Sequence, residues 1–200
     1  MNTQDFNNHF GDMDLFLMDL ILKGKVPENS SVLDIGCGEG RNGIYFIQNG
    51  YEYHGWDMDA SKLNLIAYLS DSLSEVKAHF KEIDIIDADS SKQFDFIICS
   101  RVLHLAKSEQ HFFEMWGKVK SLLLPGGMLY ASMDSVIDNN IASHLENGQY
   151  EFPDTKVRFA LTREIYKEIK KGFDEIEPLR TVVHHNERAQ SFFIFKKMSP

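Results

Sequence analysis

The sequence has little of what several classes of protein require. Only two of its 200 residues are cysteine, Cys37 and Cys99, which excludes a disulfide scaffold and predicts reduced thiols in the cytoplasm. No apolar stretch reaches the roughly 18 residues of a membrane-spanning helix. The first ten residues, MNTQDFNNHF, have neither a basic nor an apolar signal region. We therefore expect a cytoplasmic protein that is neither secreted nor bound to a membrane.

Positive charge is scarce as well. Lysine and arginine number 21 against 30 aspartate and glutamate residues, so that the formal net charge is −9 and the pI is about 5.3. A broad nucleic-acid footprint needs the opposite balance, and we expect no nucleic-acid partner. The hydrophobic content of 43% is that of an ordinary globular chain, and no internal repeat or low-complexity segment occurs. The length suits a single α/β domain over residues 1–200.

One stretch organises the rest of the chain, SVLDIGCGEGRNGIYFIQNGYEYHGWDMD. Its apolar run at residues 32–35 predicts a buried parallel strand. Residues 39–48 predict a helix that ends at Asn49-Gly50, a left-handed cap signal. A second strand is expected over residues 51–56. The order strand, glycine turn, helix and strand is typical of a nucleotide-binding unit.

The glycine turn and the end of the second strand predict a pocket. Gly36 permits a sharp turn, and Gly38 leaves bare backbone against which a ligand can lie. Asp57 stands at the tip of the second strand, about 20 positions after Gly38, where a carboxylate can bind a ribose diol. The ligand is therefore expected to be a nucleoside derivative.

The details of the turn discriminate between nucleoside ligands. A nicotinamide or flavin site has its third glycine at the position of Arg41, whereas here it comes one residue earlier, at Gly40. The carboxylates of Asp34 and Glu39 disfavour a pyrophosphate and favour a cation. We therefore expect S-adenosylmethionine (SAM), which carries an ammonium and a sulfonium group. A nicotinamide-dependent oxidoreductase is the less favoured alternative.

Three segments resemble the class I SAM-dependent methyltransferases: VLDIGCGEGRN, HGWDMDASKL and LLLPGGMLY. The GRN ending of the first is similar to the tellurite-resistance-type small-molecule methyltransferases, and the resemblance covers roughly residues 30–135. It implies a doubly wound α/β fold with helices on both faces of a seven-stranded sheet. The implied strand order is 3-2-1-4-5-7-6, with the last strand antiparallel. It also implies SAM-dependent methyl transfer to a small-molecule acceptor.

The resemblance assigns cofactor roles by position. Asp34, Gly36 and Gly38 match residues that line the methionine half of SAM, and Asp57 matches the acid that binds both ribose hydroxyls. Asp84 falls where the family places a partner of the adenine amino group, with a solvated Asp84 as the alternative. The full set of expected cofactor-binding residues adds Cys37, Arg41, Asn42, Met58, Ile85, which would cover the adenine ring, and Ser100.

Two side chains have open roles. Arg41 either pairs with the SAM carboxylate, reaches an anionic acceptor, or bonds acidic residues at the surface. His104 follows the predicted fourth strand, residues 94–100, at the crevice outside the strand ends, and is the candidate general base. A histidine packed in a hydrophobic loop is the alternative. No metal site is expected, and because methyl transfer needs mainly proximity, a SAM-binding protein without catalysis is a second alternative.

The flanking segments carry the remaining expectations. Residues 1–28 form a helical extension, whose helix we expect at the sheet edge because of its apolar stripe, and Phe10 is an alternative lid over the cofactor. Residues 134–161 are a polar insertion expected near the acceptor site; the oligomeric state stays open. Further helices are expected at residues 60–72, after the cap Ser108, and at 162–171, and further strands at 76–84, 173–184 and 189–197.

Overall fold

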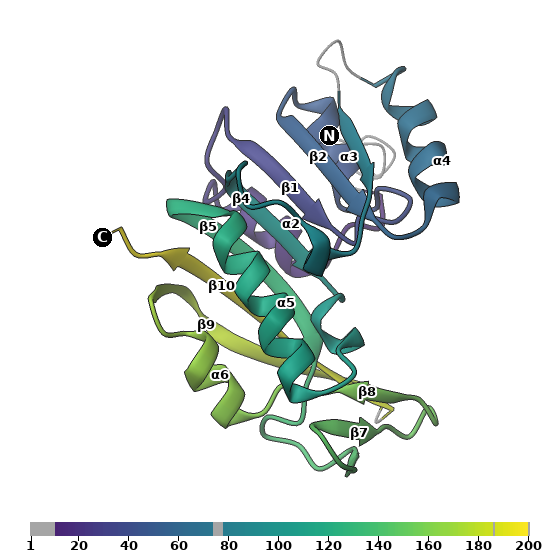
Figure 1. Cartoon of the computed structure of the whole chain (residues 1–200), viewed down its shortest axis with the longest axis vertical. Helices are drawn as coiled ribbons and strands as arrows, with labels where there is room; N and C mark the ends of the chain where they lie inside the picture. The colour runs from purple at the N-terminus through teal and green to yellow at the C-terminus, as the bar shows by residue number, and fades with distance from the viewer. Residues whose placement is uncertain (1–10, 74–77, 186, 200) are drawn as a thin grey trace.

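A seven-stranded sheet forms the centre of the computed structural model, which describes residues 11–73, 78–185 and 187–199. Its order is β3-β2-β1-β4-β5-β10-β9 (Figure 1). Strands β3, β2, β1, β4 and β5 are parallel neighbours, and β10 is antiparallel to both β5 and β9. This order confirms the prediction, with β9 and β10 as the sixth and seventh strands. The strands are β1 (Ser31–Ile35), β2 (Glu52–Asp57), β3 (His79–Glu82), β4 (Phe94–Ser100), β5 (Leu123–Asp134), β9 (Phe173–His184) and β10 (Arg188–Lys197).

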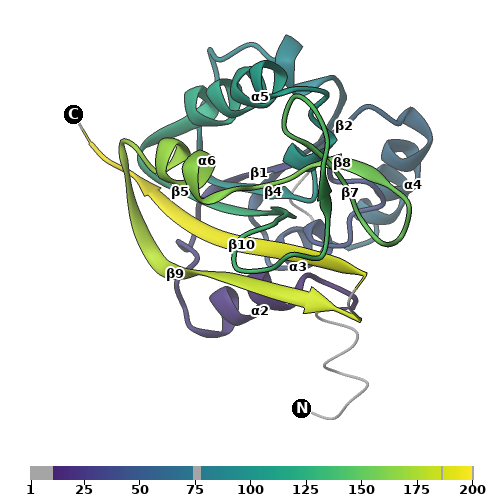
Figure 2. The same cartoon turned by 90° about the horizontal axis from the view of Figure 1, so that it is seen from below.

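Helices cover both faces of this sheet, as Figure 2 shows for α5 and α6 on one side and α2 and α3 on the other. Helices α5 (Glu109–Leu122) and α6 (Arg163–Ile169) bury their apolar stripes in one cluster. Helices α2 (Leu15–Leu22), α3 (Gly43–Gln48) and α4 (Ala60–Ser70) contribute to the second cluster on the opposite face. The buried apolar runs of β1 and β4 supply side chains to both clusters, as the sequence predicts for strands covered twice.

Polar caps start the longer helices at the predicted places. The Asp59 side chain accepts a hydrogen bond from the Ser61 backbone N–H at 3.0 Å at the start of α4. Ser108 Oγ accepts from the His111 N–H at 3.1 Å before α5. Each cap satisfies a backbone donor that has no partner within its helix, which fixes where the helix begins.

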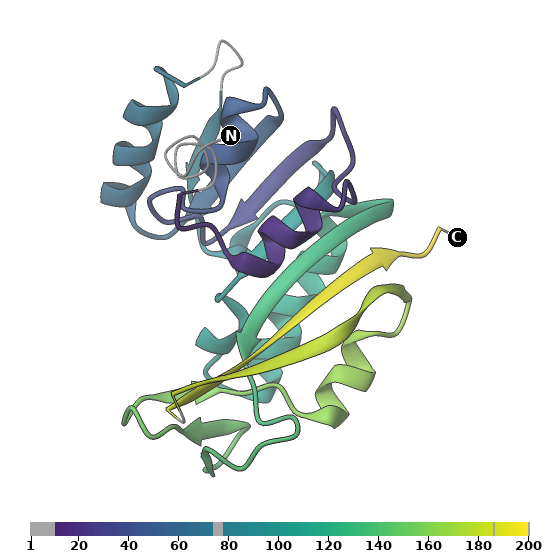
Figure 3. The same ribbon diagram turned by 180° about the vertical axis from the view of Figure 1, so that it is seen from behind.

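Two predictions about helices are wrong. Helix α3 begins at Gly43 rather than near Glu39, because Gly40 has φ +86° and no helix can pass through that conformation. Helix α2 lies across the face of the sheet (Figure 3) instead of at its edge. Its Phe16 ring lies 4.2 Å from the Phe192 ring of β10, and Leu17 and Leu20 are fully buried. The wide apolar stripe of α2 thus covers central strands, which leave more apolar surface to bury than an edge does.

The insertion at residues 134–161 forms a small sheet of its own. Strands β6 (Ser143–His144), β7 (Gln149–Glu151) and β8 (Val157–Phe159) pair antiparallel in sequence order. Figure 1 shows β7 and β8 at one end of the main sheet, beside the turn of β9 into β10. Strand β8 packs on the 3₁₀ turn η2 (Leu103–Leu105), which follows β4. Across the described ranges, no helix has the length and apolarity to traverse a membrane.

Candidate functional site

A cavity of ≈ 540 Å³ lies at the carboxyl ends of the parallel strands. Ile35 and Asp57 reach it from the ends of β1 and β2, and Arg101 reaches it from the residue after β4. In an open parallel sheet this is the crevice where ligands bind. Its lining comprises Ile35, Gly36, Trp56, Asp57, Met58, Lys62, Ile83, Asp84, Ile85, Ile86, Arg101, Val102, Leu105, Lys107, His111 and Met115.

Five of the predicted cofactor residues line this cavity: Gly36, Asp57, Met58, Asp84 and Ile85. Met58 is exposed and Ile85 is buried, so that the cavity has an exposed thioether in its lining and a buried apolar side chain in its wall. Asp84 caps the 3₁₀ turn η1 (Ile85–Asp87), with its Oδ1 accepting from the Ile86 N–H at 3.1 Å. This contact holds the Asp84 carboxylate at the cavity wall.

The Asp57 carboxylate organises the glycine turn. Its Oδ2 accepts a hydrogen bond from the Gly38 N–H at 2.8 Å, and its Oδ1 accepts one from the Asp59 N–H at 2.9 Å. Each oxygen keeps a second lone pair for a ligand hydroxyl. Gly38 has φ +54°, and a Cβ built on it would meet no atom within 4 Å. Open space therefore lies beside bare backbone next to an anchored carboxylate, as a nucleoside site requires.

Asp34 lies beneath the turn and outside the cavity lining. It is 2% exposed, and its Oδ2 accepts a hydrogen bond from the Tyr53 hydroxyl at 3.0 Å. Burial raises the pKa of the Asp34 carboxyl to about 7, against the opposing effects of Tyr53 and Arg41. Near neutral pH this carboxyl is therefore balanced between its charged and neutral forms.

Cys37, Asn42 and Ser100 are buried and serve contacts within the protein. Burial raises the pKa of the Cys37 thiol far above its usual range, so the thiol stays protonated. Asn42 Oδ1 accepts from the Asp14 N–H at 3.1 Å, and Ser100 Oγ donates to Asp14 Oδ2 at 3.2 Å. Asp14, the N-cap of α2, thus connects the start of α2 to Asn42 in the turn after β1 and to Ser100 at the end of β4. Sequence reasoning missed Asp14, although an acid directly before an apolar helical stripe is an N-cap signal.

Arg41 and Arg101 lie near other charged residues of the site without bonding to them. Neither guanidinium has a hydrogen bond or ion pair with any residue in the described part of the chain. The predicted alternative of Arg41 bonding surface acids is therefore not observed there. Arg101 has φ +63°, a backbone conformation that non-glycine residues rarely adopt and that clusters at functional sites. Its place, one residue after a central parallel strand, predicts from the sequence that it faces the crevice, and it lines the cavity there.

His104 is buried in η2, with 6% of its surface exposed. Burial lowers the pKa of the imidazole to about 4, and the nearby Asp134 opposes this only in part. His104 Nδ1 has no hydrogen-bond partner. The imidazole is therefore neutral at pH 7 and keeps an unused polar atom, and its role as a general base stays a prediction.

Several lining residues were not predicted, notably Lys62, Lys107 and His111. They come from α4, the loop before α5 and the first turn of α5, and only packing of these helices against the strand ends brings them together. Phe10, the alternative lid, lies outside the described residues. Within the described ranges, no group of three His, Cys, Asp or Glu residues is arranged to hold a metal ion.

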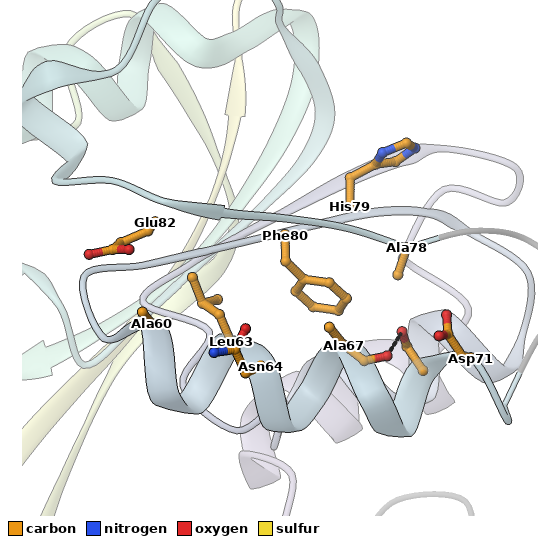
Figure 4. Close-up of a pocket in the computed structure, with 10 residues that line it drawn as sticks. Ala60, Leu63, Asn64, Ala67, Asp71, Ala78, His79, Phe80 and Glu82 are labelled. Carbon is orange, nitrogen blue, oxygen red and sulfur yellow. Dashed lines mark hydrogen bonds between the residues drawn. The ribbon is translucent and has the colours of Figure 1, made fainter.

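A second cavity, of ≈ 580 Å³, lies between α4 and the edge strand β3. Figure 4 shows the Phe80 ring pointing from β3 toward α4, above Leu63 and Ala67. None of the predicted site residues lines it. We therefore place the candidate site at the strand ends.

Comparisons with known proteins match the part of the chain that contains the glycine turn and most of the parallel strands. A family model described as a methyltransferase domain matches residues 33–129. A curated relative, the probable S-adenosyl-L-methionine-dependent methyltransferase TehB of Haemophilus influenzae, is 30% identical over 94 residues, which is 46% of this chain and 32% of TehB. The chain thus spans about a third of the length of that relative.

Solved structures share the fold over nearly the whole chain. The crystal structure of TehB from Haemophilus influenzae has a TM-score of 0.70 at 20% identity, over 90% of this chain and 62% of that one. The Burkholderia thailandensis 1,6-didemethyltoxoflavin-N1-methyltransferase, solved with S-adenosylhomocysteine, has a TM-score of 0.72 at 17% identity, over 98% and 82% of the two chains. Residues 33–129 thus match the methyltransferase-domain family, and the sheet has the strand order expected of the class I SAM-dependent methyltransferases.

Proposed function

We propose that this protein binds SAM in the cavity at the strand ends and transfers its methyl group to a small-molecule acceptor. The observation that carries the proposal is the pairing of bare backbone at Gly38 with the anchored carboxylate of Asp57. A cradle that a Cβ would fill, beside an acceptor for two hydroxyls, suits a ribose-bearing ligand. The family match over residues 33–129 supports the same ligand.

Each part of the cavity has a role in this proposal. Asp57 accepts hydrogen bonds from the ribose hydroxyls, while Asp84 and Ile85 bind the adenine edge and face. Asp34, next to the turn, supplies negative charge near the ammonium group, and a cation there would favour its ionised form. Arg41, which has no partner among the described residues, is available to the ligand's carboxylate.

Methyl transfer requires little of the protein beyond the positioning of the donor and the acceptor. When bound, SAM supplies a methyl group on a positively charged sulfur. The chain's residues have to hold the acceptor in line with that methyl group and to exclude water. The apolar walls formed by Val102, Leu105 and Met115 serve the second need. His104 would take up a proton only from an acceptor that loses one, and its low pKa makes it a weak base in the protein without ligand.

Two other functions are compatible with parts of this site. A SAM-binding protein without catalysis would need the same cavity. A nicotinamide-dependent oxidoreductase is disfavoured by Arg41 at the place of its third glycine and by the acid Asp34 before the turn. The free, buried thiols of Cys37 and Cys99 support the cytoplasmic location that we propose.

A thermal-shift panel tests the proposal. SAM and S-adenosylhomocysteine at 100 times their dissociation constants should each stabilise the protein by about 2.7 kcal/mol, and NADH and NADPH should not. A response confined to NADH or NADPH would contradict the proposal. Transfer of a labelled methyl group from SAM to a panel of small molecules then separates the enzyme from a SAM-binding protein without activity.

A further inference from the structure

A polar cluster lies buried at the carboxyl end of β5, outside the residues assigned to SAM. Asp134, the last residue of β5, is fully buried. Its Oδ1 accepts a hydrogen bond from Arg188 Nε of β10 at 2.5 Å. Its Oδ2 lies 3.2 Å from Arg158 Nε of β8, as an ion pair without hydrogen-bond geometry. The small sheet of the insertion thereby reaches the end of the main sheet.

This cluster contains more guanidinium groups than its carboxylates pair with. Arg158 is already paired, because its Nη1 and Nη2 donate hydrogen bonds to the Asp154 carboxylate oxygens at 3.1 and 2.5 Å. Arg188 binds Asp134 through Nε alone, and its Nη2 is buried without a partner. Arg101 has no ion pair within the described residues, and the charges of Arg188 and Arg158 act on it. Three guanidinium groups thus share two carboxylates.

Other polar atoms in the same place also lack partners. Gln190 lies opposite Asp134 in the β5–β10 pairing, and its Nε2 is buried and unbonded. His104 Nδ1 is in the same state, and Asp134, Arg188 and Arg101 are its charged neighbours. Buried polar atoms without partners are costly, and a polar ligand bound here would satisfy several of them at once.

We propose that the methyl acceptor is an organic acid whose carboxylate binds between Arg101 and Arg188, close to His104. The inference rests on the proposed function and names the class of its acceptor. A carboxylate fits because a guanidinium group presents two parallel N–H donors to it. The Arg101 backbone N–H donates to the Ser132 carbonyl at 2.8 Å, two residues before Asp134 on β5, and Arg101 also lines the SAM cavity, so the bound acid would lie next to the methyl donor.

The apolar surroundings of Arg101 favour an organic body on the acid. Val102 and Leu105 follow Arg101 in the chain and line the same cavity, and Leu105 is 63% exposed. A free inorganic oxyanion would leave these side chains uncovered. The formal net charge of −9 disfavours anions over the surface as a whole, so that an anion needs a local group of cations such as this one.

Calorimetric titration with carboxylic acids and their neutral amides tests the proposal. Benzoate and hexanoate, added to the protein saturated with S-adenosylhomocysteine, should bind about 10- to 100-fold more tightly than benzamide and hexanamide. Arg101→Gln should weaken acid binding by the same factor, since Arg101 has no protein partner whose loss would disturb the fold. Arg163→Gln is the matched control, because Arg163 is exposed and pairs with Asp138 at the surface.

Three results would overturn this inference: equal binding of acids and amides, unchanged acid binding by Arg101→Gln, or inorganic phosphate binding as tightly as the acids. The titrations are repeated without S-adenosylhomocysteine. If the proposed function is wrong, the unmodified protein does not bind S-adenosylhomocysteine. If only the acid site is wrong, the protein binds S-adenosylhomocysteine but does not prefer the acids.

Discussion

The two halves of the strand-end crevice differ in how they are built. On the β1–β2 side, backbone groups and one carboxylate make the site, as in the bond from the Gly38 N–H to Asp57. On the β4–β5 side, long charged side chains from β8 and β10 converge on Asp134. The first side lies within the part matched by the methyltransferase-domain model, residues 33–129, and the second draws on residues beyond it.

We interpret this difference as a division between binding of the cofactor, which related proteins share, and binding of an acceptor that is particular to this protein. Backbone at a glycine turn recognises what all nucleosides of one kind have in common. On the β4–β5 side the polar groups are side chains, whose identity a fold does not fix, and we propose that they recognise the acceptor. The comparison predicts that changes on the two sides affect different measurements.

The largest effect is expected from Asp134→Ala on the β5 side. It would leave the mostly buried guanidinium groups of Arg158 and Arg188 without their shared carboxylate, which should cost about 3–5 kcal/mol of unfolding free energy. Arg163→Gln, which removes the exposed partner of Asp138, should cost about 0–1 kcal/mol. Urea unfolding of both variants measures the contrast, and equal losses would show that the Asp134 cluster does not hold the two sheets together.

The pH dependence of stability should have opposite signs on the two sides. The pKa of Asp34 is about 7 in the folded protein, above its ordinary value of 3.8, so the folded state holds a proton that the unfolded chain has lost. Its contribution therefore lowers the unfolding free energy as pH rises through that window, by about 1.4 kcal/mol for each unit of difference. Asp34→Asn should remove this fall and make the variant the more stable protein at pH 8.

His104 should act in the reverse sense. Its pKa is about 4 in the folded protein, below its ordinary value of 6.5, so the unfolded chain holds the extra proton between those values. Its contribution raises the unfolding free energy as pH rises from 4 to 6.5. His104→Gln should therefore gain stability relative to the unmodified protein at pH 4.5. Unfolding curves from pH 4.5 to 8 of the unmodified protein and both variants measure these contributions as differences in unfolding free energy. Differences that change with pH in the same direction for both variants would refute this contrast between the sides.

A smaller effect is expected from Asp57→Ala on the affinity for S-adenosylhomocysteine. Loss of the ribose carboxylate should weaken binding by about 1–3 kcal/mol. The control is Asp59→Ala, which removes the N-cap of α4 and should cost about 0.5–2 kcal/mol of stability while leaving affinity unchanged. Calorimetry of both variants separates the two roles, and an affinity loss confined to Asp59→Ala would place the ribose acid elsewhere.

The geometry of the β1–β2 side was predictable from the sequence because its signals are local, and the role of this side in binding a nucleoside stays a prediction. A glycine turn and an acid on the next strand lie within one stretch of chain, and the bond between Gly38 and Asp57 follows from that spacing. The strand order followed from the family resemblance together with the apolar runs, and the sheet confirms it. The start of α3 was placed too early because periodicity alone does not show that Gly40 has a positive φ.

The acceptor side was not predicted in detail because its signals are long-range. Asp134, Arg158 and Arg188 are spread over the last third of the chain, and only the pairing of β10 with β5 and the folding of the insertion bring them together. An arginine in a polar segment has no periodicity that distinguishes it from a solvated one. The sequence favours a position of the insertion near the acceptor site, which stays a prediction, but contains no local pattern that identifies its contacts.

A structure of the protein with S-adenosylhomocysteine tests the central claim most directly. The account predicts the nucleoside in the ≈ 540 Å³ cavity, with both ribose hydroxyls on the Asp57 carboxylate and the adenine between Asp84 and Ile85. The sulfur should point toward Arg101 and the end of β4. A nucleoside bound between α4 and β3, or no binding at millimolar concentration, would contradict it.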